Sequence, residues 1–78
     1  MTQKRRFTAI ISRGGDGFVS FCPSLDITSQ GDTVDEARTN LIEAVELFFE
    51  SADASEVSRR LLSETYVTWI DMAVPGEI

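Results

Sequence analysis

Hydrophobic and polar positions alternate with a strand-like period at the start of the chain. Residues 6–12 (RFTAIIS) and 18–22 (FVSFC) are short, apolar and partly β-branched, and residues 13–17 (RGGDG) separate them. This pattern predicts two antiparallel strands joined by a tight turn, because glycine supplies the positive φ angles that hairpin turns require. Residues 27–30 (ITSQ) are more polar, and we expect them to form a short third strand at an edge of the sheet.

A helical period replaces the strand-like period after Thr33. Apolar residues then recur three and four positions apart and predict a helix from about Val34 to about Ser51. Glu36 follows Thr33 at the spacing of a capping box, in which the Thr hydroxyl accepts a hydrogen bond from the Glu36 backbone N–H and the glutamate reaches back. We therefore predict that Thr33 and Glu36 form the structural cap of this helix.

The last third of the chain contains one clear strand signal and one ambiguous segment. Residues 66–74 (YVTWIDMAV) are rich in β-branched and aromatic side chains and predict a strand that Pro75 and Gly76 end. Residues 52–65 are either a short helix capped by Ser55 or a loose connection.

The order of these elements predicts the fold class. Residues 1–78 are short enough for a single domain, and they run strand, strand, strand, helix, strand. We predict an α+β fold of two layers, in which a small, mostly antiparallel sheet carries one main helix on one face. If the last strand runs parallel to the first and beside it, a right-handed crossover gives the strand order 3-2-1-4.

Alternation along the strands assigns side chains to the two faces of the sheet. We expect the more apolar set of each strand to face the helix, which leaves Ile10, Phe18, Val67 and Trp69 on the open face. Exposed apolar patches with aromatic residues are typical of interfaces. We therefore predict that these four residues bind a protein partner or a second copy; in the alternative, residues 52–65 fold back over this face.

Composition and charge exclude several kinds of chemistry. The chain has 13 acidic residues, 7 basic residues and no histidine, which gives a formal net charge of −6. Such a charge disfavours nucleic-acid binding and fits a basic protein partner. Cys22 has no histidine to activate it, and the acids at the start of the helix are explained by capping and the helix dipole. We predict no enzymatic activity, no metal site and no cofactor.

Cysteine usage and hydropathy bear on the cellular compartment. The single cysteine cannot form an internal disulfide, and no apolar run is long enough to span a membrane. We expect a cytoplasmic protein without a membrane partner.

Between Asp16 and Glu50 the chain carries an ordered set of motifs. A glycine turn is followed by CPSL at residues 22–25, SQGDT at 29–33, and Glu-Ala pairs at 36–37 and 43–44. This set resembles the HicB-like antitoxin family. In many members PGC follows the leucine of the CP-x-L segment, whereas this chain continues with Asp26-Ile27-Thr28 and is one residue shorter there. The resemblance implies a partial ribonuclease-H-like fold, and a domain that often self-associates and that binds and blocks a small basic toxin that cuts mRNA.

Three functions remain open on the sequence. The first is the toxin-binding role of an antitoxin, and the second is a solitary, self-associating HicB-like protein. The third is a degenerate metal-dependent nuclease, which residues 7–12 (FTAIIS) disfavour because they offer no acid to hold Mg²⁺. No helix-turn-helix or ribbon-helix-helix pattern follows the last predicted strand, so we expect no direct DNA binding.

Overall fold

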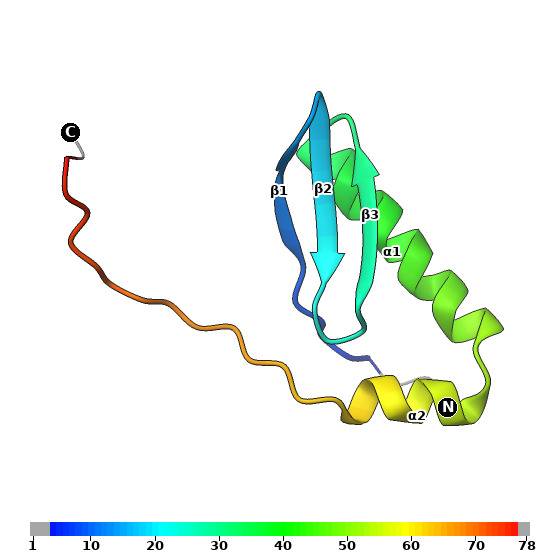
Figure 1. The fold of residues 1–78 in the computed structure, drawn as a ribbon. Coiled ribbons are helices and arrows are strands. Elements are labelled where there is room, and N and C mark those ends of the chain that lie inside the picture. Colours follow the sequence, from blue (N-terminus) through cyan, green and yellow to red (C-terminus); the bar gives the residue numbers. More distant parts are fainter. Residues whose placement is uncertain (1–3, 77–78) are drawn as a thin grey trace.

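The chain folds into a sheet covered on one face by a long helix, as Figure 1 shows for the computed structural model, which describes residues 4–76. Its elements are β1 (Ile10–Gly14), β2 (Gly17–Cys22), β3 (Ile27–Gly31), α1 (Val34–Ser51) and α2 (Ala54–Leu62). The three strands pair antiparallel in the order β1-β2-β3. The predicted α+β class with a small antiparallel sheet and a main helix is confirmed.

The first hairpin has a two-residue turn. Gly14 pairs with Gly17, and Gly15 between them has a φ of 60°. Glycine at the first central position is what a type II′ turn requires. β1 begins at Ile10, four residues later than the pattern predicts, because β2 stops before Pro23 and residues further upstream have no strand to pair with.

The connection between β2 and β3 supplies the centre of the core. Leu25 has no exposed surface and packs with Cys22 and Leu41, while Phe48 and Leu61 lie partly buried around this cluster. The leucine therefore joins the sheet, α1 and α2 although it belongs to none of them.

Small residues let α1 approach the sheet closely. The Ser20 hydroxyl donates a hydrogen bond of 2.8 Å to the Ala37 carbonyl oxygen, and both residues are buried. A Cβ atom on Gly31 would lie 2.5 Å from the Ala37 backbone nitrogen. α1 consequently packs mainly over β3 and β2 and contacts β1 least.

Thr33 is the N-cap residue of α1. Its Oγ1 accepts a hydrogen bond of 3.0 Å from the Glu36 backbone N–H, and Glu36 Oε1 accepts one of 3.1 Å from the Asp32 backbone N–H. The glutamate thus reaches back to the residue before the cap. Two backbone N–H groups at the helix start, those of Asp32 and Glu36, are satisfied by side-chain oxygens in this way, which fixes where the chain turns from β3 into α1.

We expect Thr33→Ala to lower the free energy of unfolding by about 1 kcal/mol, because the Glu36 N–H loses its acceptor. The matched control is Thr39→Ala at an exposed position inside the same helix, where alanine costs nothing. Urea melts followed by circular dichroism measure both variants. Coincident melts of Thr33→Ala and the wild type would contradict the capping role.

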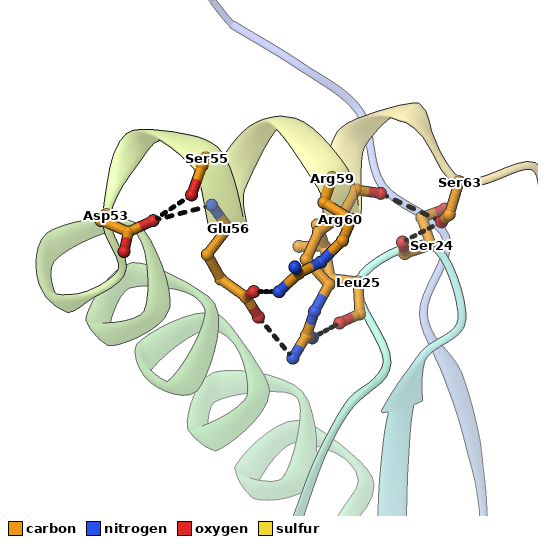
Figure 2. A network of polar contacts seen from close by, with 8 residues as sticks. All are labelled: Ser24, Leu25, Asp53, Ser55, Glu56, Arg59, Arg60 and Ser63. Atoms are coloured by element: carbon orange, nitrogen blue, oxygen red, sulfur yellow. Dashed lines mark hydrogen bonds and ion pairs between the residues drawn. The ribbon is translucent and has the colours of Figure 1, made fainter.

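α2 is a helix capped by Asp53 rather than by Ser55. Asp53 Oδ1 accepts hydrogen bonds from the Glu56 backbone N–H, at 2.9 Å, and from the Ser55 hydroxyl, at 2.8 Å. Figure 2 shows this cap together with the ion pairs from Glu56 to the arginines at 59 and 60. The ambiguous segment of the sequence is therefore helical, and its cap lies two residues earlier than Ser55.

Two contacts attach the end of α2 to the β2–β3 connection. The Arg60 guanidinium donates to the Leu25 carbonyl oxygen, and the Ser63 hydroxyl lies 3.2 Å from the Ser24 carbonyl oxygen (Figure 2). Arg60 also lies over the Phe48 ring, 5.2 Å from its centroid. These contacts place α2 at one end of the sheet and therefore determine where residues 64–76 leave the domain.

The predicted strand order 3-2-1-4 is wrong. Residues 66–74 form no strand and pair with nothing; Figure 1 shows them running away from the domain in an extended path. Their strand propensity is not satisfied within the described chain, because pairing needs a neighbouring edge and these residues do not lie beside one. Among residues 4–76, the sheet has three strands and β1 is one of its edges.

Candidate protein-binding surface

We call the side of the sheet opposite α1 the open face, and it carries a small apolar patch. Ile10 pairs with Phe21 across β1 and β2, and Val19 lies between Ser12 and Gln30 in the middle of the sheet. Ile10 and Val19 keep 44% and 37% of their surface exposed, and Phe21 is half-buried. Uncovered apolar side chains on a flat sheet are typical of a binding surface.

α2 does not cover this face. Its contacts go to the β2–β3 connection and to the core cluster, through Arg60, Leu61 and Ser63. The alternative in which residues 52–65 fold back over the open face is therefore wrong. The open face remains free along the described chain.

The four predicted interface residues occupy three different places. Ile10 lies on the open face, as its alternation predicts. Phe18 lies on the helix-facing side with Ser20, below the guanidinium of Arg13, which is 4.7 Å from its ring centroid. Val67 and Trp69 are in the extended C-terminal segment, with 54% and 92% of their surface exposed. The structure thus does not bring the four together.

Sequence reasoning placed Val19 and Phe21 on the wrong face. It assigned the more apolar set of β2 to the helix, whereas the helix packs on the set that contains Ser20 and Cys22. The signal that points to this arrangement is residue size. Ser20 and the small Ala37 allow backbones to approach closely, so burial here follows volume and not hydrophobicity.

A shallow acidic depression of about 360 Å³ lies at the end of the sheet away from α2. Asp16, Asp32 and Glu36 line it beside backbone from Gly17 and Gly31. The carboxylate of Glu36 already accepts the Asp32 N–H. Three acids and no lysine or arginine line the depression, and Arg13, over the ring of the lining residue Phe18, is the one base named beside it; the acids outnumber it and favour a basic group over a phosphate.

The acids and the cysteine of residues 4–76 form no metal-binding cluster. Within residues 4–76, no three His, Cys, Asp or Glu side chains are grouped so that they could hold a metal ion. Cys22 is buried in the core and lies against Leu25 and Leu41. Over the same residues, no helix is long and apolar enough to cross a bilayer.

Comparison with known proteins finds one curated relative. The chain is 45% identical over 47 residues to the UPF0150 protein ssr1765 of Synechocystis sp., a segment that covers 58% of this chain. The chain spans 60% of the length of that relative. No family model matches the sequence, and no solved structure matches it. The match supports a relationship at the level of a family.

Proposed function

We propose that this protein is a non-catalytic protein-binding module of the HicB-like antitoxin type, which binds a small basic toxin and blocks its cleavage of mRNA. The observation that carries the binding role is the open face, where Ile10, Val19 and Phe21 form an uncovered apolar patch on a rigid sheet. The similarity to a UPF0150 protein, a HicB-like family, favours the antitoxin type. We propose that it binds no DNA directly and needs neither a metal nor a cofactor.

Charge supports a basic partner. The formal net charge of −6 attracts a basic protein over distances of about 10 Å at 0.1 M salt. The acidic depression at the turn end of the sheet adds a local concentration of Asp16, Asp32 and Glu36. We propose that the apolar patch supplies most of the affinity and that the acids speed the encounter. Such a complex would form in the cytoplasm, where the toxin meets mRNA.

The experiment uses a small basic protein encoded beside this gene, purified and tested for RNA cleavage. We expect the antitoxin-type chain to bind it and suppress cleavage in proportion to the amount added. Val19→Lys should weaken binding at least about tenfold, since it places a positive charge in the centre of the open face against a basic partner.

The matched control is Val19→Thr, which keeps the β-branched shape and adds a hydroxyl but no charge. Circular dichroism establishes that both variants are folded. Unchanged affinity of Val19→Lys contradicts the assignment of the open face, and failure of the wild-type chain to bind or inhibit the toxin contradicts the function itself.

The second candidate function is self-association without a toxin. The specific observation that favours it is the exposed apolar segment after α2, where Trp69 keeps 92% of its surface. Sedimentation of the purified chain tests self-association, and the cleavage assay with the basic protein distinguishes the two functions, because a chain that self-associates and does not inhibit cleavage favours the second.

A further inference from the structure

The C-terminal tail (residues 64–76) is an unpaired strand sequence. It is irregular and extended as far as Val74, turns at Pro75 and Gly76, and pairs with no strand (Figure 1). Its apolar side chains, Tyr66, Val67, Trp69, Ile70, Met72 and Val74, are all exposed. A segment with this composition and exposure needs a partner surface, because water-exposed apolar strands are an aggregation hazard.

The same molecule has an unoccupied edge. β1 pairs only with β2, so the backbone groups on its other side face no strand among the described residues. α1 lies mainly over β3 and β2, which leaves the region beside β1 uncovered on the helix side as well. A fourth strand added at β1 would gain both a ladder of hydrogen bonds and a helix to pack against.

An apolar groove lies in line with this edge. It has a volume of about 330 Å³ and runs between residues 7–9, upstream of β1, and one side of α1. Its apolar lining includes Phe7, Cys22, Leu41, Ile42 and Val45. Cys22 and Leu41 belong to the core cluster, so a side chain entering the groove extends the existing core.

The tail complements the groove in pattern and in charge. Alternation in a strand places Ile70, Met72 and Val74 on one side, which is an apolar set of the kind the groove can take. The tail carries the acids Glu64 and Asp71 and no base.

The groove, in contrast, carries a net positive charge. Arg5 and Arg38 line it together with a single acid, Glu46. Asp71 alternates to the side opposite Ile70 and Met72, so this difference in charge favours the approach of the tail to the groove at long range and does not fix the register.

We propose that the tail of each molecule adds as a strand to the β1 edge of a second copy and inserts Ile70, Met72 and Val74 into the groove beside α1. The contacts of Arg60 and Ser63 hold the start of the tail at the β2–β3 connection, from which it leaves its own sheet. Each copy therefore presents a free strand and a free edge at the same time. Two copies related by a twofold axis satisfy both, and neither tail nor β1 edge stays exposed.

Strand exchange also extends the open face. When Ile70 and its set face the groove, Val67 and Trp69 point to the opposite side of the enlarged sheet. They then lie on the same face as Ile10 of the copy that receives the tail. The exchange is independent of any toxin, and its test needs only the purified chain.

The test separates the donor strand from the acceptor groove in two full-length variants. Ile70→Asp puts a charge on the groove side of the tail, and Ile42→Glu puts one into the groove at a partly exposed position of α1. Both sites are solvent-accessible in the domain, so both variants should fold. Leu47→Glu, on a more exposed part of the same helix and outside the groove, is the control.

Sedimentation over a concentration series measures the mass of each protein. We expect a dimer for the wild type and for Leu47→Glu, and a dissociation constant raised at least about tenfold in each groove or tail variant alone. An equimolar mixture of Ile42→Glu and Ile70→Asp should dimerise more tightly than either variant alone and less tightly than the wild type, because the intact tail of the first enters the intact groove of the second while the reverse contact stays blocked.

Three outcomes overturn the proposal. A wild type that stays monomeric at every concentration shows that the tail does not exchange between molecules. A dimer that persists in Ile70→Asp lies elsewhere on the surface. A mixture that dimerises no more tightly than either variant alone shows that tail and groove do not bind each other between molecules.

Discussion

Leu25→Ala should lower the free energy of unfolding by about 2–5 kcal/mol. The side chain has no exposed surface and fills the space between Cys22 and Leu41, so its truncation leaves a cavity in the centre of the core. Among residues 4–76 the largest fully buried side chains are those of Leu25, Cys22 and Ser20, and Leu25 is the largest of the three. Since small domains are stable by about 0.05–0.15 kcal/mol per residue, the loss is a large share of the total.

The position of Leu25 makes this cavity hard to close. The Leu25 carbonyl oxygen accepts from Arg60, and its N–H donates to the Cys22 carbonyl oxygen at 3.3 Å. The next residue, Asp26, has a φ of 56°, a left-handed conformation that few residues other than glycine adopt. This backbone is therefore held on both sides of the cavity and cannot collapse into it.

Leu62→Ala is the matched control, because it makes the same substitution at a side chain that is 80% exposed on α2. We expect a change within about 0.5 kcal/mol. Urea melts of the wild type and both variants give the comparison. Equal midpoints for Leu25→Ala and Leu62→Ala would contradict the central place of Leu25 in the core.

Gly31→Ala should destabilise the domain by about 1–3 kcal/mol or more. A methyl group on Gly31 would lie 2.5 Å from the Ala37 nitrogen and 2.8 Å from the Glu36 carbonyl carbon. These are backbone atoms of the first turns of α1, which cannot rotate away as a side chain can. The helix start has to move, and the hydrogen bond from the Asn40 amide to the Gln30 carbonyl oxygen, 2.7 Å long, is strained with it.

Gly76→Ala controls for the change of glycine to alanine. Nothing lies within 4 Å of the added methyl group, and although Gly76 has a φ of 78°, it is at the end of the unpaired tail, where the backbone can change this angle without disturbing the domain. We expect its denaturation midpoint to match that of the wild type. A Gly31→Ala protein as stable as Gly76→Ala would show that α1 can shift without cost and that the close approach is not required.

Local patterns determined the elements from residue 17 to residue 51. The helix spans Val34–Ser51, the range that its apolar spacing predicts, because a cap at Thr33 and the helical period act on neighbouring residues. The hairpin likewise follows from glycines in its turn. Such signals depend on residues a few positions apart, so no knowledge of the rest of the fold is needed to interpret them.

Packing between distant residues decided which side of the sheet is covered. Hydrophobicity favours Val19 and Phe21 as the buried pair, yet α1 packs against Ser20, because the distance between helix and sheet depends on small residues that meet across the layers. Alternation states which residues share a face but not which face the helix takes, since either choice satisfies the same pattern.

The sequence by itself determined that residues 66–74 are apolar and strand-forming, but not where they lie. A strand is stable only when its backbone groups find a partner, and its composition does not name that partner. In the tertiary structure, the contacts of Arg60 and Ser63 hold α2 at the end of the sheet, and the tail leaves the domain from there. β1 therefore remains an edge of the sheet among residues 4–76. Strand propensity is a property of the segment, whereas pairing depends on the geometry of the whole chain and of any molecule bound to it.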